Sequence, residues 1–160
     1  MGRRFIKQIT LEGKEATPEW KKRNKGAIVF DSMFEYLFYQ KLKALGLKFE
    51  FHPAQRELVP SFKTPALSRG KEDKLILSTV RPIRYTPDFL IFTDDGTKIF
   101  IETKGFFEDG ARLRYKLFQR SLAKNELTFI VYSMKEGNKF LNMLVENFVQ
   151  IKKFTNINKI

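Results

Sequence analysis

The stretch RYTPDFLIFTDDGTKIFIETKG, residues 84–105, constrains the fold of this chain more than any other segment. It contains two apolar runs joined by Asp94-Asp95-Gly96, which is typical of a three-residue hairpin loop with a left-handed glycine. With that loop, residue 93 pairs with residue 97, and the residues further out pair in step. A two-residue turn at Asp95-Gly96 would shift the pairing by one residue.

The pairing register decides where the charged residues of this hairpin lie. Asp88 stands at the head of the first apolar run, and Glu102 and Lys104 stand at the tail of the second. The three-residue loop places Asp88 directly opposite Glu102, and Lys104 shares their face because strand side chains alternate. The opposite face would be apolar, with Phe89, Ile91, Ile99 and Ile101. The shorter turn would separate the two acids across the sheet.

Two opposed carboxylates repel each other and destabilise a sheet, unless a cation lies between them. The chain has no cysteine and one histidine, so oxygen ligands predict Mg²⁺ or Mn²⁺ in preference to zinc. A lysine beside such a site can orient a water molecule and offset charge on a phosphate. The competing interpretations are that Asp88 caps a neighbouring loop and that Glu102 and Lys104 form an exposed ion pair.

Pro87-Asp88, followed by Glu102-Thr103-Lys104 at the end of the next strand, matches the signature of the PD-(D/E)xK nucleases. The segments YTPDFLIF and IFIETKG, preceded by SMFEYLFYQKLKALGLKFEF, resemble the phage endonuclease I family of Holliday-junction resolvases and related small phage nucleases. This resemblance implies an α/β fold with a restriction-endonuclease-like αβββαβ core, whose mixed central sheet is flanked by helices. The resemblance covers roughly residues 30–133. We expect one nuclease domain at 31–160, in which the C-terminal helix is predicted by hydrophobic periodicity and not by the resemblance, after a basic N-terminal arm at 1–30.

The resemblance also implies a role for each residue of the site. Asp88 and Glu102 would hold a first metal ion together with the backbone carbonyl of Thr103, Glu35 would contribute to a second, and Lys104 would support the attacking water. The implied cofactor is Mg²⁺, for which Mn²⁺ can substitute. The implied activity is endonucleolytic cleavage of branched DNA by a homodimer. Cleavage of linear, nicked or foreign DNA, and DNA binding without cleavage, remain alternatives.

The net charge of +12 and the pI near 9.9 predict a polyanionic partner, and DNA is the first choice. The residues that we expect to contact DNA are Arg3, Arg4, Lys21, Lys22, Arg23, Arg81, Arg84, Arg112, Lys116, Gln119 and Arg120. The alternative is that these side chains form ordinary solvated basic faces. No apolar run is long enough to span a bilayer and no signal-peptide pattern is present, so we expect no membrane partner and a cytoplasmic location.

Hydrophobic periodicity and turn residues predict the remaining elements. Helices are expected at 32–45, 109–124 and 138–154, strands at 47–59 with a break at Pro53, at 74–80 and at 127–134, and a loop at 60–73. In the N-terminal arm, Thr17, Pro18 and Gly26 predict a short basic helix with Trp20 packed on the body, and a solvated tail is the alternative.

Five residues carry further expectations. Ser32 and Glu35 have the spacing of a capping box, in which Glu35 would bond the Ser32 backbone N–H instead of a metal. His52 is expected to be structural, since a single histidine builds no familiar catalytic pair. Phe106 and Phe107 are expected in the core, with stacking on an exposed base as the alternative.

Overall fold

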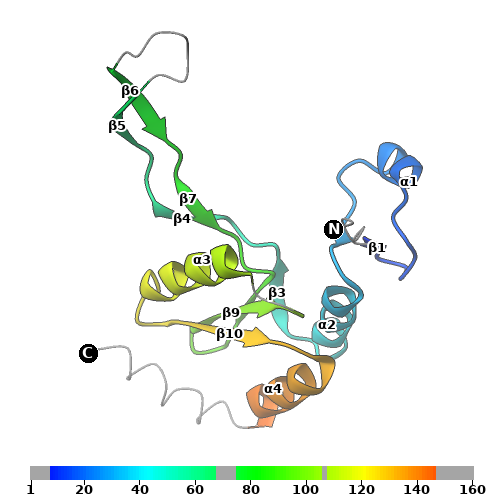
Figure 1. The fold of residues 1–160 in the computed structure, drawn as a ribbon. Coiled ribbons are helices and arrows are strands. Elements are labelled where there is room, and N and C mark those ends of the chain that lie inside the picture. Colours follow the sequence, from blue (N-terminus) through cyan, green and yellow to red (C-terminus); the bar gives the residue numbers. More distant parts are fainter. Residues whose placement is uncertain (1–7, 68–74, 106–107, 147–160) are drawn as a thin grey trace.

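The computed structural model describes residues 8–67, 75–105 and 108–146 (Figure 1). The elements in chain order are β1 (Ile9–Thr10), α1 (Pro18–Arg23), β2 (Val29–Phe30), α2 (Met33–Ala44), β3 (Lys48–Phe51), β4 (Arg56–Val59), β5 (Phe62–Leu67), β6 (Leu75–Val80), β7 (Ile83–Tyr85), β8 (Phe89–Phe92), β9 (Lys98–Thr103), α3 (Asp109–Arg120), β10 (Glu126–Val131) and α4 (Met134–Glu146). None of the helices in these ranges is long and apolar enough to cross a membrane.

The central sheet has the strand order β10-β9-β8-β3 and is mixed, as the sequence predicts. β9 and β10 are parallel, whereas β3 and β9 each run antiparallel to β8. β8 pairs with β9 from Phe89↔Ile101 to Phe92↔Lys98, and Gly96 has a φ of 81°. This register is the one predicted for the three-residue loop, so the two-residue turn is excluded.

Helices cover both faces of the sheet, with α2 and α4 on one side and α3 on the other (Figure 1). The first face includes the four predicted apolar residues Phe89, Ile91, Ile99 and Ile101. The second face, which the charged residues share, is also packed, because Leu90 and Phe100 contact residues of α3. The acids therefore lie at the end of a buried surface.

The helix boundaries differ in part from those predicted. α2 agrees, and Ser32 Oγ caps it by accepting from Glu35 N at 3.1 Å. α3 is shorter than predicted because the chain turns at Ser121, whose hydroxyl donates to the carbonyl of Phe118. α4 begins four residues earlier than predicted, at Met134 instead of Asn138, because Ser133 accepts from Glu136 N and Glu136 accepts from Tyr132 N. Its predicted continuation beyond Glu146 lies outside the described residues.

The segment predicted as a loop at 60–73 is partly a strand. β5 pairs with β6 from Phe62↔Val80 to Leu67↔Leu75 and continues the ribbon formed by β4 and β7. Pro65 does not prevent this, because a strand at the edge of a sheet can spare a backbone donor. Figure 1 shows β5 and β6 projecting away from the body. We call these two strands the hairpin arm.

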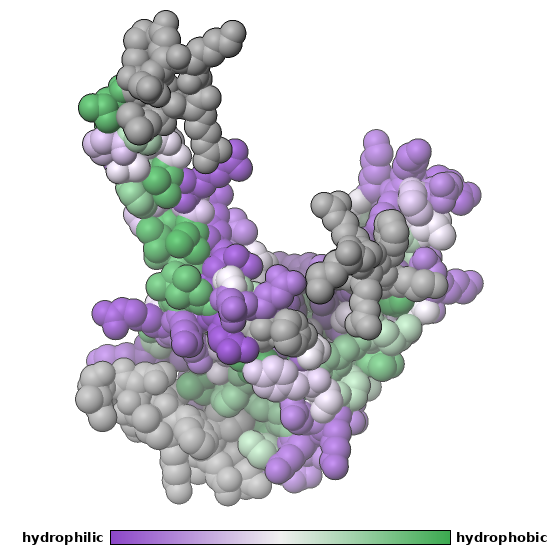
Figure 2. Space-filling model, in the orientation of Figure 1, coloured by the Kyte–Doolittle hydropathy of each residue, from purple (hydrophilic) through white to green (hydrophobic). Residues whose placement is uncertain are grey.

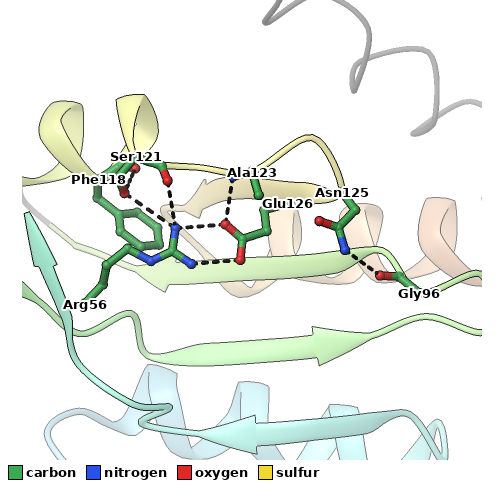
Figure 3. Close-up of polar contacts among 7 residues, drawn as sticks. All are labelled: Arg56, Gly96, Phe118, Ser121, Ala123, Asn125 and Glu126. Carbon is green, nitrogen blue, oxygen red and sulfur yellow. Dashed lines mark hydrogen bonds and ion pairs between the residues drawn. The ribbon is translucent and has the colours of Figure 1, made fainter.

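The base of the hairpin arm is joined to the sheet by an ion pair between β4 and β10 (Figure 3). The Arg56 guanidinium binds both carboxylate oxygens of Glu126 at 2.8 Å and lies over the rings of Phe100 and Phe118. Burial acts to raise the pKa of Glu126, but Arg56 and the backbone N–H of Ala123 hold it below its ordinary value. This pair fixes β4, and through it β7, against the sheet.

The N-terminal region is folded from residue 8 onward, which excludes a solvated tail for the described part. β1 pairs with β2, and α1 has the predicted cap, with Thr17 Oγ1 accepting from Trp20 N at 3.2 Å. The helix ends at Arg23, before Gly26, because Asn24 forms the C-cap. Trp20 is only half-buried.

Candidate metal centre

Asp88 and Glu102 meet at the end of the central sheet. Asp88 directly precedes β8, whose pairing with β9 begins at Phe89↔Ile101, and it lies close enough to Glu102 in β9 for its charge to raise the pKa of Glu102. Both residues are buried, with exposed fractions of 7% and 4%. The acids that the turn register was expected to bring together are therefore neighbours on one face.

The Asp88 carboxylate is held by the neighbouring strand. Its Oδ2 accepts from the backbone N of Thr103 at 2.6 Å and from Thr103 Oγ1 at 2.7 Å. Burial raises the pKa of Asp88 above its ordinary value, although the Thr103 bonds, Lys104 and His52 act in the opposite direction. Asp88 thus bonds an adjoining strand end, but it also faces Glu102, so the capping interpretation accounts for only part of its environment.

Glu102 and Lys104 form a mostly buried ion pair. Lys104 Nζ lies 2.8 Å from Glu102 Oε1, and the side chains are 33% and 5% exposed respectively. The ion pair of the alternative interpretation is therefore present, but its carboxylate is buried and not exposed. Within the described part of the chain, Glu102 Oε2 is buried and makes no hydrogen bond of standard geometry, although the Tyr85 hydroxyl lies close enough to lower the pKa of Glu102 by hydrogen bonding. A cation bound here would compensate for the lost hydration of this oxygen.

Glu35 caps its helix, but through a different donor from the one predicted. It lies in the first turn of α2, and its Oε2 accepts from Asp31 N at 2.9 Å, not from the Ser32 N–H expected for a capping box. The side chain is buried, with 7% exposed. Burial and the charge of Asp88 raise its pKa to about 8. Glu35 therefore caps its helix and also lies within electrostatic reach of the acids on the sheet.

The three acids form a buried carboxyl cluster in a basic protein. Burial is the largest cause of the raised pKa of Asp88, Glu102 and Glu35. Lys104 partly offsets their charge, and its own pKa is raised because Glu102, Asp88 and Glu35 outweigh the effect of burial. Such a region favours binding of a divalent cation, which would stabilise the ionised carboxylates.

The donor set fits a hard divalent cation. Every candidate side-chain ligand is a carboxylate, the ligand type that hard divalent cations prefer. As the side chains stand, no group of three or more His, Asp or Glu residues in the described ranges is arranged to hold a metal ion. Lys104 and Thr103 satisfy other oxygens of the two sheet acids. A metal ligand role for the carbonyl of Thr103 stays a prediction.

Tyr85 is a neighbour of the centre that sequence reasoning missed. Its hydroxyl is buried beside the Glu102 carboxylate, which it can reach as a hydrogen-bond donor without making a bond of standard geometry. Burial, and next the charge of Glu102, raise the pKa of Tyr85 above its ordinary range. The sequence places Tyr85 three residues before Asp88 but does not predict that its ring lies near Glu102. The orientation of the ring depends on the bend between β7 and β8.

His52 is a second neighbour of the centre, after Tyr85. Its backbone N donates to the carbonyl of Asp88 at 2.8 Å, and its φ is 47°. This contact agrees with the expected structural role. The imidazole also stacks on Phe51 and acts to lower the pKa of Asp88.

The side chains expected to contact DNA lie mainly on the surface. Exposed members of this group are Lys21, Lys22, Arg23, Arg81, Arg84, Arg112, Lys116, Gln119 and Arg120. Arg84 is engaged with Glu57, at 3.1 Å. Arg3, Arg4, Phe106 and Phe107 lie outside the described residues. Exposure agrees equally with DNA contact and with a solvated basic face.

A scan against protein-family models matches residues 19–138 to the family described as "Protein of unknown function (DUF1064)". This chain belongs to that family. The DUF1064 match includes Glu35, Asp88, Glu102 and Lys104, as well as the whole hairpin arm. Searches of curated proteins and of solved structures find no match.

Proposed function

We propose that this DUF1064 protein is a divalent-metal-dependent DNA endonuclease that hydrolyses phosphodiester bonds, with a preference for branched DNA such as four-way junctions. The observation that carries the proposal is the buried pair Asp88 and Glu102 on one sheet face, with Lys104 bound to Glu102. The order α2-β3-β8-β9-α3-β10 supports the restriction-endonuclease-like core implied by the resemblance.

Each residue of the centre has a distinct task in this proposal. Asp88, Glu102 and the carbonyl of Thr103 hold Mg²⁺, for which Mn²⁺ can substitute, and Glu35 contributes to a second ion. A bound ion supplies Lewis acidity and lowers the pKa of a water molecule. Thr103 keeps Asp88 oriented through its two hydrogen bonds. Lys104 orients the attacking water and offsets the charge that develops on the phosphate.

DNA binding and assembly follow from charge and from the kind of substrate. The net charge of +12 supports binding to the phosphate backbone, which positions DNA without reading its sequence. A homodimer would pair two cuts across a branch point. The branch preference and the dimer are carried over from the resemblance, and a cytoplasmic location agrees with a DNA substrate.

The test is cleavage of a four-way junction, a matched duplex and a single strand with Mg²⁺, Mn²⁺ or EDTA. We expect junction cutting with either metal and none with EDTA. Asp88→Ala and Glu102→Ala should abolish cutting, while salt-sensitive DNA binding remains. Glu146→Ala, which removes an exposed acid at the end of α4, is the matched control and should cut normally.

Each other result contradicts a separate part of the proposal. Equal cutting of duplex and junction would contradict the branch preference and favour a nuclease of the same chemistry with another DNA target. Undiminished cutting by both alanine variants would contradict the site. Binding that survives EDTA, with no cutting under any divalent metal, would favour a DNA-binding protein without activity.

A further inference from the structure

The hairpin arm stands without a packing partner in the described part of the chain. β5 and β6 pair closely with each other, and neither makes extensive contact with another helix or strand of these residues. A two-stranded ribbon alone is marginally stable in water. The arm therefore needs a further surface to become well ordered.

Both faces of the hairpin arm expose large apolar side chains. Phe62, Ile76 and Val80 are on one face, with exposed fractions of 51%, 45% and 36%. Leu75 and Leu77 are on the other, 79% and 68% exposed. Figure 2 shows hydrophobic surface along the projecting ribbon on the face in view. Each face also carries polar side chains, Thr64 and Ser78 on the first and Lys63 and Thr79 on the second. Because both faces nevertheless expose large apolar side chains, the ribbon is suited to burial.

The charge of the hairpin arm argues against DNA as its partner. β5 and β6 contain one charged residue, Lys63, whereas the whole chain carries a net charge of +12. Binding to nucleic acid depends chiefly on Lys and Arg contacts to phosphates. An apolar ribbon with a single charged residue is suited instead to a protein surface of the same character.

A second copy of the chain offers such a surface. Two chains of +12 repel each other over most of their surfaces, so they approach most easily where charge is absent. An antiparallel ribbon also carries the same apolar groups on each copy, which a two-fold axis can bring together. We propose that the hairpin arms of two copies pack against each other and form the dimer interface. The inference deepens the dimer proposed above, but its argument rests on the arm alone and is independent of the nuclease chemistry.

The first test is the molar mass of the full chain in solution, measured by sedimentation velocity over a range of concentrations. The wild type should be a dimer, and Leu75→Ser/Leu77→Ser should be a monomer with unchanged circular dichroism. Val145→Ser is the matched control, because Val145 is 57% exposed on α4, away from the arm, and it should remain dimeric. A wild type that is monomeric up to about 100 µM would overturn the proposal.

The second test uses the absence of cysteine from the sequence. Thr79→Cys places a single thiol on the exposed arm and should give a covalent dimer on mild oxidation, whereas Val145→Cys should not. Dimers that persist in the arm variants would overturn the interface. A monomeric wild type whose DNA binding is lost in the arm variants would also overturn it, because the arm would then contact DNA. A dimer that cuts no DNA would contradict only the nuclease proposal, and a monomer that cuts would contradict only the arm interface.

Discussion

Three buried carboxylates, Asp88, Glu102 and Glu35, lie close enough to influence one another around Lys104. Each loses hydration on folding, and the partial compensation comes from Thr103, Lys104 and the N–H of Asp31. Folding therefore brings three carboxyl groups together although their burial and mutual repulsion do not stabilise the fold. Titratable groups with pKa values perturbed in this way occur preferentially at functional sites.

Glu35 gives the centre a pH dependence with a definite sign. Its folded pKa of about 8 lies above the ordinary value of 4.5, so the folded state holds the proton more tightly. The stabilising contribution is complete below the ordinary pKa and is lost as pH rises through the folded pKa. Relative to Glu35→Gln, the wild type should lose on the order of 1–3 kcal/mol of unfolding free energy between about pH 5 and about pH 8.

Urea unfolding of both proteins at the two pH values measures this difference. Glutamine can still accept from Asp31 N, so the cap is preserved in the variant. Glu146→Gln, an exposed residue of α4, serves as the control and should follow the wild type. Parallel pH curves for wild type and Glu35→Gln would contradict the buried, electrostatically coupled position of Glu35.

The residues of the centre differ in how far the sequence predicts them. Asp88, Glu102 and Lys104 follow from strand alternation once the turn length is known. Glu35 lies on a different element, and only the resemblance to known nucleases selects it over its role as a helix cap. Tyr85 reaches Glu102 through the bend between β7 and β8, which no local pattern encodes.

At the scale of elements, the β8–β9 hairpin controls the centre through its turn. Gly96 takes a positive φ, and Thr93 N donates to the carbonyl of Thr97 at 3.1 Å to close the loop. A one-residue change in pairing moves every side chain of a strand to the other face. The length of this turn therefore determines whether Asp88 and Glu102 meet.

Deletion of Asp94 should shorten the turn, shift the pairing by one residue and separate the two acids. We expect the variant to lose measurable Mg²⁺ or Mn²⁺ binding by calorimetry, and to lose cleavage, with lower thermal stability. Asp94→Ala keeps the turn length and is the matched control, which should bind metal normally. Wild-type metal affinity in the deletion variant would show that the register does not govern the site.

The elements that the sequence misplaces have identifiable causes. Pro65 and the neighbouring polar residues favour a loop, but a two-stranded ribbon tolerates proline because each strand is an edge. The start of α4 depends on Ser133 and Glu136, whose capping bonds extend the helix toward its N-terminus. In α4 the hydrophobic pattern begins after the first hydrogen-bonded residue. In β5 the hydrophobic pattern is too weak to predict the strand that the backbone hydrogen bonds form.

At the scale of the whole molecule, an acidic centre lies within a strongly cationic surface. α3 follows the centre in the chain and presents exposed cations at Arg112 and Lys116. α4, on the opposite face of the sheet, presents Lys135 and Lys139. The net charge of the sequence predicts the class of partner, but the distribution of cations around the sheet depends on the fold.

Arg112→Ala/Lys116→Ala should weaken DNA binding and reduce the slope of log affinity against log salt by roughly 0.9 for each lost phosphate contact. Lys135→Ala/Lys139→Ala changes the net charge equally and should leave the slope nearly unchanged. Fluorescence anisotropy with a labelled junction over a salt series measures both. Equal effects of the two pairs would indicate a general charge effect and contradict a binding face on α3.

The pairing at the base of the arm also bears on how this family can diversify. The chain leaves the core after Val59 and returns at Ile83, and these two residues are paired neighbours. Because these two residues are adjacent, the segment between them can vary in length or sequence without changing the connections of the central sheet. Sequence changes in the hairpin arm can therefore alter the binding partner of the protein while the carboxylate centre is retained.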